Sequence, residues 1–218
     1  MSEGGDGFRS ALVHGARELG IVLEPHHLEL FEVYVRELLK WNRKVNLTSL
    51  RDEEEVAVKH FLDSLTVAPL LEEEGELLDL GTGAGFPGLV LKIYSPSVRA
   101  VLLDASQKRV FFLRHLIRIL RLKGVEVLHG RAEDPSLRRK AGEFSLVVSR
   151  AFASLEEFLR MAIPYTRKGG KVIAMKGPRG REELCRLREG LPLVLEEVRE
   201  VELPRGMGRR LLILFRRT

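Results

Sequence analysis

Short apolar runs alternate with helically spaced apolar residues along most of the chain after residue 76. This alternation predicts a parallel sheet with helices between its strands. The last two runs are separated only by a short stretch that contains Pro204 and two glycines, so these strands should pair antiparallel. We expect strands at residues 77–80, 98–103, 125–128, 144–149, 171–175, 194–203 and 210–215.

The first third of the chain has only helical patterns. A helix should begin at Pro25, because apolar residues then recur on one stripe. Other helices are expected over residues 9–20 and 53–71, and an acidic run at 72–76 follows them. We therefore predict an N-terminal helical region over 1–75, packed on the core of an α/β domain over 76–218.

The first expected strand leads into a glycine loop that ends at Gly88. Gly83, Gly85 and Gly88 fit the dinucleotide pattern G-x-G-x-x-G, and Asp104 ends the next strand, near the place of a carboxylate that binds ribose. The unit of strand, glycine turn and helix is typical of nucleotide binding. An NAD-dependent oxidoreductase is therefore one candidate.

Two residues of the loop favour a cationic nucleoside over a dinucleotide. The charge of Asp79 would oppose a diphosphate. Pro87 removes a backbone N–H that could bind phosphate. S-adenosylmethionine has a ribose together with ammonium and sulfonium groups, and D-x-G-x-G-x-G resembles the first motif of class I methyltransferases. We therefore expect S-adenosylmethionine as the cofactor.

Further candidate ligands follow the later strands. Asp104 can accept hydrogen bonds from both ribose hydroxyls. Ala132 and Glu133 follow the third strand, where they should border the adenine end of the cofactor, although Glu133 is equally well explained as a surface acid. Arg150 ends the fourth strand, where it could orient the cofactor, clamp a phosphate or pair with Asp79.

Composition and charge narrow the class of protein. The chain is 44% apolar and 31% charged, with a formal net charge of +5. No apolar run approaches the length of a membrane span, and the N-terminus lacks a signal-peptide pattern. The lone Cys185 excludes an internal disulfide and a multi-cysteine zinc site. We expect a cytoplasmic protein that uses no metal and does not bind membranes.

Basic residues are concentrated in two stretches of the chain, and this indicates that RNA is a binding partner. Lys176 and Arg179 follow the fifth strand, and Arg114 and Arg118 repeat on one face of a helix expected over 107–122. We expect these residues to contact the RNA backbone, although a basic helical stripe is also an ordinary solvated face. A non-catalytic RNA-binding assembly factor is therefore a further alternative.

The sequence lacks two motifs of related methyltransferases. It has no Asn or Asp followed by Pro-Pro-Tyr for exocyclic amines, and no cysteine after a proline for attack on a pyrimidine ring. Methylation of a purine ring nitrogen requires neither of these motifs. Guanine N7 attacks a methyl group without losing a proton, so catalysis requires placement and no obvious general base.

Several motifs together resemble one family, the bacterial 16S rRNA guanine-N7 methyltransferases called RsmG or GidB. The family pattern W-N-x-x-x-N-L-T-S matches residues 41–49. The resemblance extends from about Leu28 to Phe215. The other matching segments are His60, Asp63 and Ser64 (H-x-x-D-S), the glycine loop with Pro87-Gly88, Ser149-Arg150-Ala151, and Lys176-Gly177.

The resemblance implies a class I methyltransferase that transfers a methyl group from S-adenosylmethionine, leaving S-adenosylhomocysteine, to a guanosine in the decoding-region loop of 16S rRNA. We expect it to act as a monomer, and loss of the family's enzyme is linked to low-level streptomycin resistance. Asn42 and Asn46 could simply cap and turn the chain, but the resemblance suggests that their segment faces the cleft. The implied cofactor contacts are Gly81, Phe86, Ala132, Glu133, Arg150 and Asp104, beside Asp79 and Gly83 of the loop, and the candidates for substrate positioning are Asn42, Asn46, Arg150 and Lys176.

Overall fold

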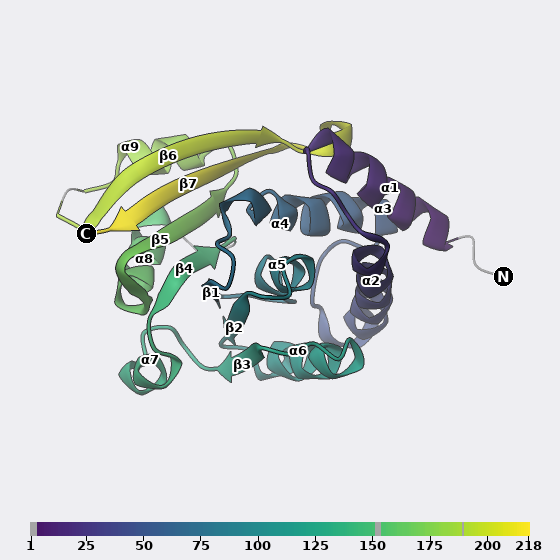
Figure 1. Ribbon diagram of the computed structural model, residues 1–218, viewed down its shortest axis with the longest axis horizontal. Helices are drawn as coiled ribbons and strands as arrows, with labels where there is room; N and C mark the ends of the chain where they lie inside the picture. The colour runs from purple at the N-terminus through teal and green to yellow at the C-terminus, as the bar shows by residue number, and fades with distance from the viewer. Residues whose placement is uncertain (1–3, 151–153, 189) are drawn as a thin grey trace.

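The computed structural model describes residues 4–150, 154–188 and 190–218, and shows one seven-stranded sheet between two layers of helices (Figure 1). The strand order is β3-β2-β1-β4-β5-β7-β6, and only β7 runs antiparallel to its neighbours β5 and β6. This confirms the expected seven strands with an antiparallel final hairpin. The strands are β1 (Glu76–Leu80), β2 (Arg99–Asp104), β3 (Val125–His129), β4 (Phe144–Ser149), β5 (Thr166–Lys176), β6 (Leu193–Glu202) and β7 (Arg209–Arg217).

The central strands are apolar on both faces because helices cover both sides of the sheet. Leu77 of β1 packs on one face, whereas its neighbour Leu78 packs on the other. In the parallel register Leu77 lies opposite Ala100 of β2 and Leu146 of β4. These aligned strands bring their carboxyl ends to the same edge of the sheet.

One layer contains the N-terminal helices together with α5 and α6, and the other contains α7, α8 and α9 (Figure 1). Helix α2 extends past Trp41 to Val45, and α6 ends three residues before the expected Leu122 because Arg121 is left-handed (φ 52°). The helices are α1 (Gly4–Glu18), α2 (Pro25–Val45), α3 (Glu53–Val56), α4 (Asp63–Leu65), α5 (Gly88–Tyr94), α6 (Gln107–Ile119), α7 (Pro135–Ala141), α8 (Leu155–Ala162) and α9 (Gly180–Cys185).

The N-terminal helices share a hydrophobic core with the sheet. The ring of Phe61 packs edge-on against Phe8, Phe31 and Tyr34, at 5.0 to 5.1 Å between ring centroids, and against Phe86 of the glycine loop at 5.4 Å. Phe61 lies in a π-helical turn, Ala57–Leu62, between α3 and α4. The N-terminal helices and the sheet thus share one core, and the division into a helical region over 1–75 and a domain over 76–218 stays a prediction.

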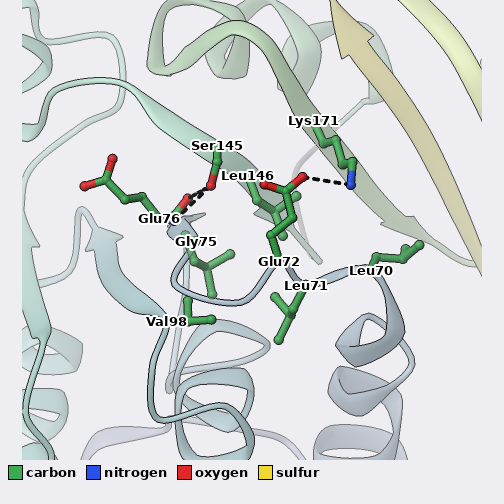
Figure 2. A pocket seen from close by; sticks show the side chains of 10 residues that line it. Leu70, Leu71, Glu72, Gly75, Glu76, Val98, Ser145, Leu146 and Lys171 are labelled. Atoms are coloured by element: carbon green, nitrogen blue, oxygen red, sulfur yellow. Dashed lines mark hydrogen bonds and ion pairs between the residues drawn. The ribbon is translucent and has the colours of Figure 1, made fainter.

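The acidic segment before β1 is tied to the amino-terminal edge of the sheet (Figure 2). Glu72 forms an ion pair with Lys171 at 3.0 Å, and the Ser145 hydroxyl accepts a hydrogen bond from the Glu76 N–H and donates one to its carbonyl. These residues enclose a cavity of about 10 Å³, which has room for about one water molecule. A space of this size is too small for a nucleoside.

Candidate functional site

A cavity of about 460 Å³ opens at the carboxyl ends of β1, β2 and β4. This volume is within the range of small-molecule sites, roughly 300 to 1,000 Å³, and the position is the usual one in an open α/β sheet. The cavity brings together five predicted residues, Gly81, Gly83, Phe86, Asp104 and Arg150. Its lining also includes seven residues that were not among the predicted site residues, Leu47, Thr48, His60, Thr82, Ala84, Ala105 and Arg109.

The glycine turn has a left-handed backbone that brings it close to the helical layer. Gly83 (φ 63°) faces open space, and a Cβ added there would meet nothing within 4 Å. Gly85 (φ 103°) is enclosed, because an added Cβ would lie 2.4 Å from the hydroxyl of Tyr34. That hydroxyl donates a 2.6 Å hydrogen bond to the carbonyl of Ala84. The turn therefore packs tightly on one side and leaves room for a ligand on the other.

Asp79 supports the glycine turn from below and does not line the cavity. Its buried Oδ2 accepts hydrogen bonds from the Thr82 hydroxyl at 2.6 Å and from the Gly88 N–H at 2.8 Å. Oδ1 has no hydrogen-bond partner among the described residues. Burial is the main cause that raises the pKa of this carboxyl to about 6. The predicted contact of Asp79 with the cofactor stays a prediction, since its buried side chain lies behind the turn and not in the cavity lining.

Asp79 is expected to make the folded protein less stable as the pH rises. Its pKa of about 6 lies above the ordinary value of 3.8, so between these values the folded chain holds a proton that the unfolded chain has released. The bound proton stabilises the folded state fully below a pH of about 3.8, and this stabilisation is lost as the pH rises through about 6. The free energy of unfolding falls by about 3 kcal/mol in all.

Urea unfolding from about pH 4 to pH 7 should therefore show a free energy of unfolding that falls relative to the variant Asp79→Asn. The variant has no carboxyl to titrate at this position. Its own pH dependence therefore gives the contribution of all other titrating groups. A constant difference between the two proteins across this range would contradict the prediction.

Asp104 lies at the rim of the cavity, where a ribose-binding carboxylate was expected. Its Oδ2 accepts a 2.9 Å hydrogen bond from the Gly83 N–H, and its Oδ1 accepts one of 2.8 Å from the Ser106 N–H. Arg109 lies 3.5 Å from the same Oδ2. The carboxylate is thereby held in place by the turns after β1 and β2, and its contact with a ribose stays a prediction.

The segment after α2 reaches the cavity through Leu47 and Thr48. Asn42 stabilises this turn of the chain. Its side-chain N–H donates to the Thr48 carbonyl at 2.8 Å, and its side-chain oxygen accepts from the N–H groups of Leu47 and Thr48. Asn46 ends the helix in a left-handed conformation (φ 49°) and is exposed. Both asparagines thus shape the turn, as in the capping alternative, and the residues they position face the cavity.

His60 lies in the π-helical turn and stacks on Phe86, with 4.6 Å between ring centroids. Such turns often occur at functional sites. Nδ1 lies 3.1 Å from the Lys59 carbonyl, which can only accept, so Nδ1 carries the proton. Nε2 then accepts a hydrogen bond from the Thr48 hydroxyl at 2.7 Å. Burial, with Arg150 nearby, lowers the pKa of His60 to about 3, so the ring is neutral.

Arg150 pairs with Asp63 and not with Asp79, which corrects the ion pair considered from the sequence. Its guanidinium lies 5.2 Å from the ring centroid of Phe86, 2.9 Å from the Lys59 carbonyl and 3.4 Å from the carboxylate of Asp63. Asp63 is completely buried and also binds Arg210 through two hydrogen bonds of 2.5 Å. One carboxylate thus holds two arginines, one directly after β4 and one in β7.

Other predicted site residues lie apart from this cavity. Ala132 and Glu133 line a separate hollow between α7 and α8, because they follow β3, on the far side of β2 from β1. Lys176 is buried and forms a 2.9 Å ion pair with Glu183, which does not fit contact with the RNA backbone. Arg179 is exposed after β5. Arg114 and Arg118 are exposed on α6, and Ala151 lies outside the described residues.

The cavity fits S-adenosylmethionine in three respects. Its volume suits a nucleoside, Gly83 leaves space beside the turn, and Asp104 offers a carboxylate at the rim. The aromatic face of Phe86 lies in the same wall. No group of three His, Cys, Asp or Glu residues within the described ranges could hold a metal ion. In the described part of the chain no helix is long and apolar enough to cross a membrane.

The comparisons with known proteins identify first the class and then the family. The fold is that of class I S-adenosylmethionine-dependent methyltransferases. A predicted O-methyltransferase of Agrobacterium tumefaciens matches at a TM-score of 0.59 with 18% identity, over 71% of this chain and 80% of its own. The TYW2 protein of M. jannaschii, solved in complex with AdoMet, matches at 0.55 with 15% identity, over 72% and 75%.

The sequence comparison is more specific. The GidB family model, described as rRNA small subunit methyltransferase G, matches residues 27–210. The ribosomal RNA small subunit methyltransferase G of Caldanaerobacter subterraneus is 46% identical over 199 residues, which cover 88% of this chain and 83% of that protein. The chain therefore belongs to the rRNA small subunit methyltransferase G family, which confirms the resemblance seen in the motifs.

Proposed function

We propose that the protein transfers the methyl group of S-adenosylmethionine to N7 of a guanosine in the decoding-region loop of 16S rRNA. Family membership supports the substrate, and the cavity at the glycine turn supports the cofactor. The observation that carries the proposal is the combination of the open Gly83 turn with the wall formed by His60, Phe86 and Arg150.

The residues at the turn divide the task of holding the cofactor. Gly81 and Gly83 line its wall, and Gly83 leaves space beside the turn. Asp104 would accept the ribose hydroxyls, and the Phe86 ring offers an apolar face. When bound, S-adenosylmethionine supplies an electrophilic methyl group on a sulfonium. The buried Asp79 would favour that positive charge through the low-dielectric interior once it is ionised, which its pKa of about 6 allows at neutral pH.

The polar groups of the cavity suit a nucleophile that has no proton to lose. His60 is neutral, and both of its ring nitrogens already have hydrogen-bond partners. Asp104 accepts one backbone N–H on each oxygen and would use its remaining lone pairs for the ribose hydroxyls. The described lining therefore offers no free general base, and guanine N7 requires none. We infer that the chain acts by placing the guanine in line with the methyl group.

We propose that the protein acts as a monomer in the cytoplasm, that it uses no metal, and that it releases S-adenosylhomocysteine. Its macromolecular substrate would be the small ribosomal subunit or an assembly intermediate of it.

Incubation with methyl-labelled S-adenosylmethionine and small subunits that lack the modification is expected to label one guanosine at N7. Nuclease digestion and mass spectrometry of the 16S rRNA would identify the product, and mapping would identify the nucleotide. Calorimetry with NADH is the negative control for the dinucleotide pattern of the loop. Failure to label any form of the rRNA, or a label on another atom, would refute the proposal.

A further inference from the structure

A second hollow of about 440 Å³ lies at the same edge of the sheet as the cofactor cavity. It is formed where β7 begins and α9 begins, and Leu211 of β7 lies opposite Lys176 at the carboxyl end of β5. Three arginines and one glutamate line it, namely Arg181, Arg209, Arg210 and Glu200. So basic a lining fits an anionic ligand.

A chain of contacts connects this hollow with the cofactor cavity. Arg150 lines the cavity and Arg210 lines the hollow, and both bind the carboxylate of Asp63. The preceding residue, Arg209, points to the other face of β7 and shares Glu200 with Arg181, at 3.3 and 3.0 Å. The four arginines therefore form two pairs at the carboxyl edge of the sheet, one pair around Asp63 and one around Glu200, on opposite faces of β7.

The charges of these two pairs do not cancel. Asp63 is shared by Arg150 and Arg210, and Glu200 is shared by Arg181 and Arg209. Each carboxylate therefore balances one of two guanidinium groups, which leaves two positive charges over the two pairs. The side chains of Arg181 and Arg209 are 61% and 62% exposed, so they can reach a ligand in solvent.

We propose that these four arginines, named the arginine track, bind the phosphodiester backbone of the substrate RNA next to the target nucleotide. The proposal rests on the function proposed above. Arginine presents a planar fork that binds phosphate oxygens through paired hydrogen bonds. The buried pair with Asp63 fixes Arg210 at the near end, and the exposed Arg181 and Arg209 exchange Glu200 for phosphate at the far end.

The basic face of α6 is a less suitable place for the same backbone. The helix begins at Gln107 beside the cavity and runs away from it. At 1.5 Å per residue, Arg114 and Arg118 lie about 10 and 16 Å farther along the axis. Arg114 also lies over β3, within 3.4 Å of the Val127 carbonyl. This face is therefore expected to stay solvated.

The track can be tested with the double variant Arg181→Gln/Arg209→Gln and unmodified small subunits. Subunit binding is expected to weaken by roughly tenfold, and KM to rise while kcat is retained. The slope of log K against log salt should become shallower by about 1.4, because two phosphate contacts on single-stranded RNA are lost. The matched control is Arg99→Gln/Arg167→Gln, which removes two exposed, ion-paired arginines at the opposite edge of the sheet.

The variant Glu200→Gln provides a test of opposite sign. It removes the carboxylate that competes with phosphate, so subunit binding is expected to tighten and the salt slope to steepen. Wild-type KM and slope in the arginine double variant would overturn the track, as would the same loss in Arg114→Gln/Arg118→Gln instead. Calorimetry with S-adenosylmethionine should be unchanged in all variants. Failure of the wild type to methylate any rRNA would instead refute the proposed function itself.

Discussion

Gly85→Ala is expected to destabilise the protein by about 3 kcal/mol or more, whereas Gly83→Ala is expected to weaken cofactor binding with little loss of stability. At Gly85 the new Cβ would lie 2.4 Å from the Tyr34 hydroxyl and 3.0 Å from Leu113. Tyr34 is completely buried and cannot move aside. Overpacking and a strained positive φ (103°) each cost about 1 to 3 kcal/mol.

At Gly83 the same substitution adds only the left-handed strain, about 1 kcal/mol, because nothing lies within 4 Å of the new Cβ. That space is part of the cavity wall, so the methyl group should lower the affinity for S-adenosylmethionine roughly tenfold or more. Urea unfolding and calorimetry measure the two effects separately, and each variant serves as the control for the other. Equal stability of the two variants, or unchanged affinity in Gly83→Ala, would contradict this assignment.

The features of the site that could be predicted from the sequence are local in the chain. The turn around Gly83 follows its strand directly, and Asp104 ends the next strand, so spacing alone brings both to one sheet edge. The position of Asp63 between Arg150 and Arg210 could not be predicted, because 87 and 147 residues separate the partners. Only the H-x-x-D-S motif indicated that this helix turn had a special role.

The residue types gave the charges of the site side chains, but they did not show which of these side chains are buried. Lys176 resembles a surface lysine in the sequence, but β5 lies between β4 and β7, and the side chain packs inside with Glu183. Asp79 looks like a ligand of the cofactor because it precedes the glycines, but its side chain points beneath the turn. A polar side chain at the end of an inner strand can thus either contact the ligand or stabilise the fold. Only the packing of the helices distinguishes these two roles.

Asp63→Asn is expected to destabilise the protein by about 3 to 5 kcal/mol and to weaken cofactor binding. The carboxylate is completely buried and is the shared ion-pair partner of two guanidinium groups whose side chains are only 16% and 18% exposed. Removal of one partner from such a network leaves buried charge without compensation. Arg150 would then lose a contact that holds it over Phe86, in the wall of the cavity.

The matched control for this variant is Glu200→Gln, since Glu200 also bridges two arginines but lies at the surface. Exposed ion pairs contribute little to stability, so this variant should unfold at the same urea concentration as the wild type. Replacing a carboxylate with an amide at each position thus distinguishes the two bridges of the arginine track. The Asp63 bridge beside the cavity is structural, whereas the Glu200 bridge can be replaced by phosphate. Equal urea midpoints for Asp63→Asn and Glu200→Gln would show that the buried bridge does not stabilise the fold and that Arg150 is held by other contacts.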